Sequence, residues 1–476
     1  MSGLKKNLGY QTIYQIISTC IPLITSPYLA RVLGAERQGV FSFTQSVVNY
    51  FTLFAMLGVM NYGTRVIAAC ANKEERSISF FNIFIMQLVT SLLSLVCYVV
   101  YILFFCSENR VIATIQGVYI ISCLLDINWF FFGLEKFKAV AIRSIIIRLV
   151  SLILILLLVN SPDDLWKYTS IMTGGTFFSN AVLWILIPRE VYTGDLRLVS
   201  INSVYAHIKP NLVLFIPLLA MSFFHVMDKT MLGILSNYEQ VGFYYNADKV
   251  INIPIGIING IGTVMMPRMA SLIERKENNE ASKLFSLSIE AVFAVSCAMT
   301  FGIAAISREF VPLFFGKGFD SCITLIILLS PVLIIKGLSQ TSRMEYLIPS
   351  HNEKIFIESV FAGTGVNLIV NLALIGKYGA TGAVIGTLIA ELVTCVWQYI
   401  KINSRINITS TIIKSMVYVL FGLIMLIVVR LVSRVFDELL FCVVSQILSG
   451  AIVYGTLCML YWKITNNPVI NTILKR

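Results

Sequence analysis

The chain has 476 residues, of which 57% are hydrophobic and 13% are charged, and its formal net charge is +11. Soluble proteins carry about 25% charged residues, so this composition excludes an ordinary soluble protein and indicates an integral membrane protein. The apolar runs are long and continuous, which excludes a transmembrane β-barrel, whose strands alternate apolar and polar residues. The positive charge is typical of the cytoplasmic loops of a membrane protein, and we expect no binding of nucleic acid.

The sulfur and imidazole groups do not form a recognisable site. The 10 cysteines are scattered without a Cys-x-x-Cys pair, and there are only 3 histidines. We therefore expect neither a metal site nor another cofactor, and we identify no catalytic residue.

The apolar segments predict an all-α membrane protein. A membrane-spanning helix needs about 20 mostly apolar residues, and segments of that kind predict about fourteen transmembrane helices. The first apolar run follows Lys5 and Lys6, but it is long and contains Tyr10 and Tyr14, so we interpret it as an uncleaved helix and not as a signal peptide. The predicted helices cover residues 8–33, 39–63, 78–106, 111–133, 139–160, 166–187, 209–235, 240–267, 284–307, 321–347, 354–376, 379–402, 411–432 and 438–462.

The distribution of basic residues predicts the orientation. Most of the 36 lysine and arginine residues lie in the alternate connections that share a side of the membrane with the N-terminus. Cytoplasmic loops are enriched in these residues, so we predict a multi-pass protein of the cytoplasmic (inner) membrane with both termini in the cytoplasm. The connections are short, the longest being near 188–207, and the chemistry must therefore take place within the helix bundle or at its mouths.

A short internal repeat predicts two related halves. Leu33-Gly34 is followed by Glu36-x-x-Gly39, and Leu232-Gly233 is followed by Glu239-x-x-Gly242. Six predicted helices separate the two copies, so both begin on the same side of the membrane, as in the parallel repeats of two-lobed transporters.

This repeat predicts the domain organisation. We expect an N-terminal six-helix lobe over 1–187, a cytoplasmic linker over 188–208 and a second six-helix lobe over 209–402. A terminal helix pair and a cytoplasmic tail would occupy 403–476.

Charged side chains within the predicted helices are expensive in lipid, so they normally face a cavity or an opposite charge. Their positions about the predicted turns suggest three hairpin pairs: Asp126 with Arg148, Lys336 with Glu358, and Asp228-Lys229 with Asp248-Lys249. In one interpretation these pairs only neutralise each other and hold adjacent helices together. In the other, their charges face a polar path through the protein, and the sequence leaves both interpretations open.

Polar residues also recur every three or four positions along several predicted helices. Asn49 belongs to such a face in 39–63, and Asn252 and Asn259 belong to one in 240–267. These faces are suited to a water-filled cavity, although ordinary hydrogen bonds between helices would use the same residues.

Several stretches carry a resemblance to a known family. The N-terminal part contains Pro22-Leu23-Ile24-Thr25-Ser26-Pro27-Tyr28-Leu29-Ala30-Arg31-Val32-Leu33-Gly34 and then Tyr62-Gly63-Thr64-Arg65, and the later part contains Asp228-Lys229, Leu232-Gly233 and Pro267. In these stretches the chain resembles the bacterial polysaccharide flippases of the Wzx type, which transport O-antigen or capsule repeat units. That family belongs to the MOP superfamily, together with the MATE drug exporters and the lipid II flippases.

The resemblance implies a MATE-like fold and a transport function. The expected function is to move an undecaprenyl-diphosphate-linked oligosaccharide repeat unit from the inner to the outer leaflet, by ion-coupled alternating access, for surface polysaccharide biosynthesis. The expected partners are this lipid-linked substrate and membrane lipids, with a polysaccharide polymerase and chain-length proteins as further candidates. A diphosphate requires cations and a sugar requires polar groups, so the predicted substrate-binding residues are Arg31, Lys229, Lys249, Arg148, Lys336, Asn49, Asn252 and Asn259.

The embedded carboxylates are candidates for coupling transport to an ion gradient. Four of them have a plausible basic partner and are expected to form structural charge pairs, namely Asp126, Asp228, Asp248 and Glu358. Glu391 and Glu290 have no obvious base in the sequence, so we predict that they carry the coupling ion, the alternative being that they only hold helices together.

Three other functions remain open at this point. A multidrug exporter of the same superfamily would need uncompensated acidic groups, whereas the embedded acids here are mostly balanced by bases. A polytopic membrane enzyme of polysaccharide assembly would need a large outer loop or a catalytic cluster. A lipid II flippase fits the motifs less well.

Overall fold

The computed structural model describes residues 2–192, 199–404, 406 and 408–465. All regular structure in this part of the chain is helical, and it contains no strand. The internal contacts divide the chain into two compact units, Met1–Gly233 and Ile234–Arg476. The predicted all-α fold class is therefore confirmed.

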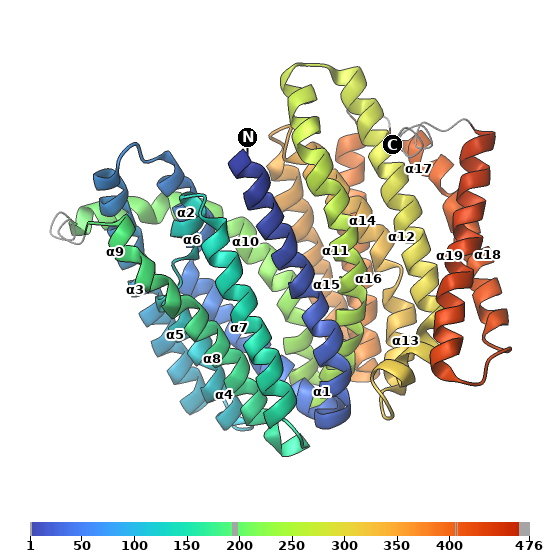
Figure 1. Ribbon diagram of the computed structural model, residues 1–476, viewed down its shortest axis with the longest axis horizontal. Coiled ribbons are helices and arrows are strands. Elements are labelled where there is room, and N and C mark those ends of the chain that lie inside the picture. Colours follow the sequence, from blue (N-terminus) through green and yellow to red (C-terminus); the bar gives the residue numbers. More distant parts are fainter. Residues whose placement is uncertain (1, 193–198, 405, 407, 466–476) are drawn as a thin grey trace. The chain divides into compact units, whose positions relative to one another are not determined.

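The helices of the first unit begin near the N-terminus and end with α10 (Figure 1). They are α1 (Ser2–Met56), α2 (Val59–Ala69), α3 (Lys73–Phe104), α4 (Arg110–Gln116), α5 (Val118–Leu124), α6 (Asn128–Gly133), α7 (Phe137–Leu158), η1 (Pro162–Asp164), α8 (Leu165–Leu183), η2 (Trp184–Leu186), α9 (Ile187–Glu190) and α10 (Ile201–Leu235). Helix α10, which the repeat assigns to the second lobe, packs with the first unit, where Phe223 contacts Tyr50 and Phe215 contacts Phe54.

Glycines set the breaks in the first unit. Gly34 interrupts α1 with φ 74° and ψ 176°, a backbone region that essentially only glycine adopts, and this break separates the two predicted helices 8–33 and 39–63. The second of these ends earlier than predicted, because Leu57 and Gly58 both adopt positive φ between α1 and α2. Gly233 has a different role, since a Cβ atom there would lie 2.1 Å from the Phe43 ring.

The core of the first unit is rich in aromatic residues. Phe80, Trp129 and Phe130 are fully buried and pack on one another. The Trp129 indole donates a hydrogen bond to Gln87 Oε1 at 2.9 Å, which satisfies a polar group that would otherwise be costly to bury. Helices α3 and α6 are thereby held together, and Val59 and Ile67 of α2 belong to the same cluster.

The second unit contains the remaining helices of the described chain. They are α11 (Tyr238–Glu274), α12 (Asn278–Phe314), α13 (Asp320–Leu329), α14 (Val332–Thr341), the π-helical segment η4 (Ser342–Leu347), α15 (Glu353–Tyr378), α16 (Ala380–Asn403), α17 (Thr409–Ser415), α18 (Val417–Val432) and α19 (Leu439–Ile464). Asn237 caps α11 by accepting a hydrogen bond from the Gln240 amide, and Gln240 Oε1 accepts one from the Ala380 amide at 3.0 Å. The start of α11 is thus tied to the junction of α15 and α16.

The number of membrane-spanning helices differs from the prediction of about fourteen. Among the described residues, 11 helices are long and apolar enough to cross a membrane, or 12 if the bent pair Asp320–Leu329 and Val332–Leu347 forms one span. One of these segments, Cys20–Ala69, contains two predicted helices. Helix α8, predicted as 166–187, is not among them, because it carries Lys167, Asn180 and several hydroxyl groups that lower its hydropathy. The count of fourteen is therefore not confirmed.

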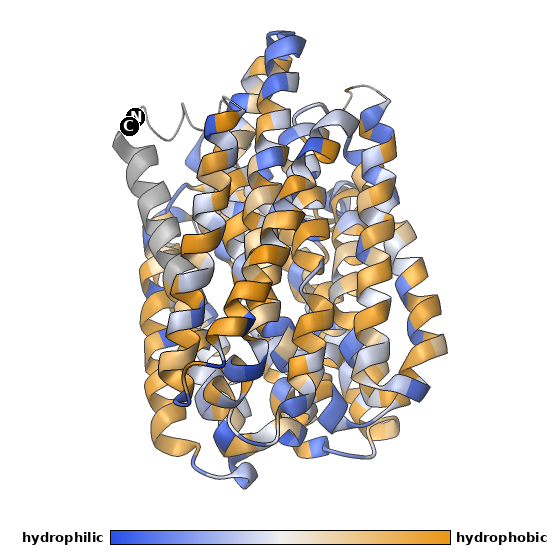
Figure 2. Cartoon of the chain, turned by 90° about the vertical axis from the view of Figure 1, so that its right-hand side faces the viewer, coloured by the Kyte–Doolittle hydropathy of each residue, from blue (hydrophilic) through white to orange (hydrophobic). Residues whose placement is uncertain are grey.

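The distribution of hydropathy along the helices is that of a protein embedded in a bilayer. Figure 2 shows hydrophobic residues along the middle of the helices and hydrophilic residues gathered towards their ends. This banding is what a lipid bilayer requires of helices that cross it. The chain is a multi-pass membrane protein.

Candidate functional site

Two of the predicted substrate-binding cations lie in the first unit on neighbouring helices. Arg31 is exposed on α1 just before the break at Gly34, and Arg148 is exposed on α7, and the two helices pack against each other. On the same pair of helices, the Tyr28 hydroxyl donates a hydrogen bond to the Val159 carbonyl at 2.7 Å. The contact between α1 and α7 thus brings two guanidinium-bearing helices together.

The environment of Asp126 differs from the predicted pair with Arg148. Asp126 Oδ1 accepts hydrogen bonds from the Asn128 side chain at 2.7 Å and from its backbone amide at 3.0 Å. Arg143 donates to Asn128 Oδ1 at 3.0 Å and to the Ser179 carbonyl at 2.6 Å. Asp126 is therefore linked through Asn128 to the guanidinium of Arg143, which lies nearer the start of α7 than Arg148 does. The prediction erred because the chain turns twice between α5 and α7 and does not form a simple hairpin.

The second unit contains a buried ion pair that the sequence did not reveal. Lys336 Nζ lies 3.3 Å from Glu391 Oε1, and their side chains are only 14% and 6% exposed. The expectation that Glu391 has no basic partner is wrong. Glu358, the predicted partner of Lys336, instead lies 3.8 Å from Lys354 in an exposed pair. The physical reason is that α14 packs along α16, so its lysine meets a residue of α16 and not one of α15.

A row of buried polar residues extends from this ion pair along α16. Gln398 Oε1 accepts a hydrogen bond from Ser339 Oγ at 3.2 Å, and Gln398 Nε2 donates to Ser359 Oγ at 3.0 Å. Thr394 lies between Glu391 and Gln398 in the sequence, and its hydroxyl donates a hydrogen bond to the Ala390 carbonyl of the same helix. Because Glu391, Thr394 and Gln398 recur at helical spacing, they form one polar face, and it joins α14, α15 and α16.

Helix α11 carries the polar residues predicted for 240–267. Asp248 Oδ1 accepts a hydrogen bond from Asn252 Nδ2 at 2.7 Å, and the Lys249 ammonium lies 4.0 Å from the centre of the Tyr245 ring. In this cation–π contact the ammonium is attracted electrostatically to the face of the ring. Further along, the Thr263 hydroxyl donates a hydrogen bond to the Asn259 backbone carbonyl, and the side-chain oxygen of Asn259 has no hydrogen-bond partner among the described residues. The helix therefore presents a cation, an aromatic ring and amide groups along its length.

The remaining predicted residues lie in different surroundings. Asn49 accepts a hydrogen bond from Gln45 at 3.0 Å on α1, while on α10 Asp228 is buried and Lys229 is half-buried. Glu290 on α12 accepts a hydrogen bond of 2.7 Å from the Tyr418 hydroxyl. The Trp462 indole in turn donates to that hydroxyl, so the terminal helices α18 and α19 contribute to the site of Glu290.

Sequence reasoning missed three polar groups within the helices. Glu345 is fully buried in the π-helical segment η4, and neither of its carboxyl oxygens has a hydrogen-bond partner among the described residues. Asn367 and Asn371 are buried on α15 and joined by a hydrogen bond of 3.1 Å. Their amides could have been found by their spacing of four residues, whereas nothing in the sequence marks Glu345 as buried.

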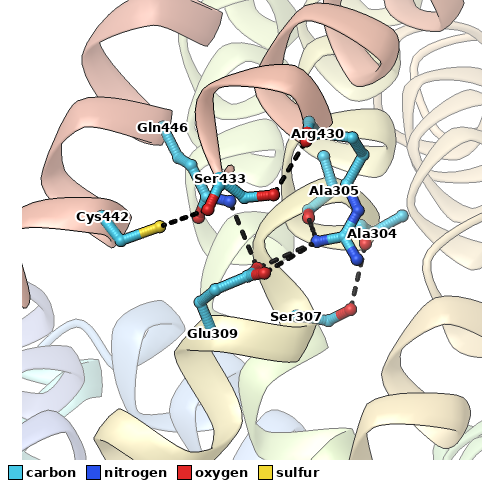
Figure 3. A network of polar contacts seen from close by, with 8 residues as sticks. All are labelled: Ala304, Ala305, Ser307, Glu309, Arg430, Ser433, Cys442 and Gln446. Atoms are coloured by element: carbon cyan, nitrogen blue, oxygen red, sulfur yellow. Dashed lines mark hydrogen bonds and ion pairs between the residues drawn. The ribbon is translucent and has the colours of Figure 1, made fainter. Parts of the chain in front are cut away.

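The third missed group joins the terminal helices to α12, as Figure 3 shows. Arg430 Nη1 lies 2.9 Å from Glu309 Oε2 and donates to the Ala305 carbonyl at 2.9 Å. Gln446 on α19 donates to the same carboxylate at 3.2 Å. The sequence did not reveal this group, because a single sequence does not show that α18 packs on α12.

These polar sites offer hydrogen bonds and charges but no recognisable metal centre. No group of three histidine, cysteine, aspartate or glutamate residues within the described part of the chain could hold a metal ion. Charged and amide groups within membrane-spanning helices normally face a cavity or a partner, and their chemistry is suited to a polar or anionic molecule.

The family follows from comparison with known proteins. Residues 4–273 match the family described as "Polysaccharide biosynthesis protein", and this match spans more than half of the 476 residues. The chain belongs to this family. The match includes α2, α10 and nearly all of α1 and α11. These helices carry the motifs from which the resemblance was predicted, and the resemblance is confirmed.

Individual proteins give a consistent result. A candidate O-antigen transporter of Escherichia coli (strain K12) is 23% identical over 408 residues, which is 85% of this chain and 98% of the relative. The lipid II flippase MurJ in an inward closed conformation is 15% identical, with a TM-score of 0.79 over 96% of this chain and 99% of MurJ. An inward-facing MATE multidrug resistance transporter of the MOP superfamily is 13% identical, with a TM-score of 0.58 over 83% and 98% of the two chains. These likenesses show that the fold is of the MurJ and MATE type.

Proposed function

We propose that this protein is a flippase that moves an undecaprenyl-diphosphate-linked oligosaccharide from the inner to the outer leaflet of the cytoplasmic membrane. The observation that carries the proposal is the family match over residues 4–273, in a chain whose helices are long and apolar enough to span a membrane. The nearly full-length similarity to a candidate O-antigen transporter supports the same function. With the basic residues on the inner side, both termini would be cytoplasmic.

The basic residues within the helices supply the chemistry for the diphosphate. Arginine binds phosphate oxygens through two parallel hydrogen bonds, whereas lysine acts as a compact positive charge. Arg31 and Arg148 are exposed on adjacent helices, so we propose that they bind the anionic part of the substrate. Lys249 lies over the Tyr245 ring. Its ammonium would attract a phosphate, and the aromatic ring would pack on a sugar ring.

The other predicted binding residues follow the same reasoning. Lys229 lies half-buried on α10 and would add a further charge, while the amides of Asn49, Asn252 and Asn259 would bind sugar hydroxyls. Lys336 is engaged by Glu391, so its contribution to substrate binding would require that pair to open.

Transport by alternating access against a gradient would require a coupling ion. We propose Glu391 and Glu290 as its binding groups, and the structure distinguishes their situations. An ion at Glu391 would compete with the Lys336 ammonium, whereas Glu290 is held by a neutral hydroxyl. Ion binding at Glu391 would therefore release Lys336, which gives a direct link between the ion and a cation that could meet the substrate.

The proposal predicts the consequence of deleting the gene from its host. Undecaprenyl-diphosphate-linked repeat units should accumulate in the membrane, surface polysaccharide should be lost, and the wild-type gene should restore both. Arg31→Gln should reduce restored export by about tenfold or more at normal protein level, because a hydrogen bond to a charged group contributes roughly 1.5–3 kcal/mol. The matched control is Lys283→Gln, which removes one charge from an exposed pair with Glu280.

The outcomes separate transport from other roles. Normal polysaccharide in the deletion strain, measured where no second copy of the gene exists, would contradict the proposal. A multidrug exporter is the second candidate, since MATE transporters share the fold. In that case the deletion strain would become sensitive to cationic drugs and its polysaccharide would be unchanged.

A further inference from the structure

A groove lies on the first unit between α7 and the segment formed by α8 and η2, which run side by side (Figure 1). Its volume is about 740 Å³, within the roughly 300–1,000 Å³ typical of small-molecule sites. One end is formed by the residues that precede and begin α7, and the groove extends from there along the helix. None of the residues proposed above to bind the substrate or the coupling ion lines it.

The wall of the groove is hydrocarbon. Ile142 and Ile146 on α7 and Val182 on α8 line it, and all three side chains are exposed. The Arg143 guanidinium crosses from α7 to the Ser179 carbonyl on α8, so the two helices are fixed to each other along the groove. A groove between two helices joined in this way and lined by aliphatic side chains is suited to an acyl chain.

The end of the groove at the start of α7 is basic. Lys136 and Lys138 lie at this end, Arg143 lines the groove further along α7, and Glu135 is the one carboxylate among the described lining residues. Lys136 also pairs with Glu190, which lies outside the lining. Among the described lining residues and Glu190 together, three side chains are basic and two are acidic, so positive charge is in excess along the groove.

The start of α7 adds to this positive potential. The side chain of its N-cap residue, Lys136, makes no capping hydrogen bond, and the amide groups and dipole at a helix N-terminus favour an anion. Lys138 lies in that first turn. The basic end and the apolar groove are therefore continuous, with the arrangement of a charged headgroup attached to a hydrocarbon chain.

We infer that this groove binds an anionic phospholipid of the membrane leaflet on the lysine-rich side of the protein. The phosphate of the headgroup would lie beside Lys138 and the start of α7, and one acyl chain would lie along Ile142, Ile146 and Val182. Basic pockets between transmembrane helices on the cytoplasmic side are suited to such lipids. This binding does not depend on the proposed transport function, because the groove uses a different set of residues.

Native mass spectrometry of the purified protein in detergent tests the inference. Phosphatidylglycerol and phosphatidylcholine with identical acyl chains are titrated separately, and the apparent affinity of the first bound lipid is compared. Wild type should prefer phosphatidylglycerol. Lys138→Glu should weaken phosphatidylglycerol binding by about fivefold or more, since a lysine near an anionic lipid contributes roughly 1 kcal/mol. Ile146→Trp should weaken it as well by filling the groove, without a change in charge.

The control is Lys283→Glu, which makes the same charge change at an exposed position on α12 and should leave the first binding step unchanged. Equal loss in Lys138→Glu and Lys283→Glu, or equal binding of the two lipids by wild type, would overturn the inference. A third arm adds undecaprenyl diphosphate. If it displaces phosphatidylglycerol from wild type but not from Lys138→Glu, the groove belongs to the transport substrate and the inference is wrong.

Discussion

At the scale of single residues, the sequence predicted which charged residues lie within the helices but not which of them form ion pairs. Lys336, Glu358 and Glu391 were all identified as embedded groups, yet Lys336 pairs with Glu391. Symmetry about a predicted turn supposes that neighbouring helices in sequence also pack side by side. Helix α14 packs instead along α16, and this choice depends on the shapes of all the helices together.

The Lys336–Glu391 pair leads to a prediction about stability. Lys336→Met leaves the Glu391 carboxylate buried without its cation, and loss of one partner of a buried ion pair costs about 3–5 kcal/mol. The free energy of unfolding in detergent micelles should therefore fall by an amount of that order. The double variant Lys336→Met/Glu391→Leu should recover most of the loss, because neither charge then remains buried.

The exposed pair of Lys354 with Glu358 provides the control. Lys354→Met should change the free energy of unfolding by less than about 1 kcal/mol, as exposed ion pairs contribute little. The account of the buried pair would be wrong if Lys336→Met were as stable as wild type, or if the double variant were no more stable than the single one.

At the scale of helices, the breaks follow from glycine and from short polar sequences. The predicted helix 111–133 is divided into α4, α5 and α6, with Gly117 at the first division and Asp126 and Asn128 at the second. Hydropathy alone could not show these divisions, because the segment as a whole is apolar enough to pass as a single membrane-spanning helix. The break at Gly34 was predicted only as a connection, and its backbone conformation became visible in the structure.

Polar turns between helices are held by local charges. Asp164 accepts hydrogen bonds from the amides of Asn160 and Ser161 and lies 2.6 Å from Lys167 Nζ. The neighbouring lysine and these amides lower the pKa of Asp164 to about 2. Because the pKa is lowered on folding, this turn keeps its contribution to stability above about pH 4 and loses it only as the pH falls towards 2.

Gly34→Ala tests the role of the break in α1. A Cβ atom at Gly34 would meet nothing within 4 Å, so the cost arises from the backbone alone and should be about 1–3 kcal/mol. Gly365→Ala is the matched control, because a Cβ atom at Gly365 would also meet nothing within 4 Å but would lie within a regular helix. There alanine should be neutral or stabilising by up to about 1 kcal/mol. Thermal unfolding that ranked the two variants equally would show that the strained conformation of Gly34 is not required.

At the scale of the whole molecule, the composition and a few motifs were sufficient for the fold class and the family. The stretch from Pro22 to Gly34 and the motif around Asp228-Lys229 lie within the family match over residues 4–273, and the fold is that of MurJ and MATE transporters. The candidate site could be predicted only as a set of residues. Their contacts depend on helix packing, and buried groups such as Glu345 carry no local signal in the sequence.

The central claim is that the protein moves a lipid-linked oligosaccharide across the bilayer. The most direct measurement uses proteoliposomes that contain the purified protein and undecaprenyl diphosphate carrying a radiolabelled oligosaccharide. A membrane-impermeant glycosidase is added outside, and the fraction of label released is followed over time. In protein-free liposomes, release should stop once the outer leaflet is consumed.

With wild-type protein, release should continue until nearly all of the label is cleaved, because the protein brings substrate from the inner leaflet to the outer one. Arg31→Gln should slow this second phase, and Lys283→Gln should not. Intact vesicles are verified by an entrapped dye, so that leakage of the glycosidase cannot produce the same result. A wild-type time course identical to that of protein-free liposomes, with the protein folded and the dye retained, would contradict the claim.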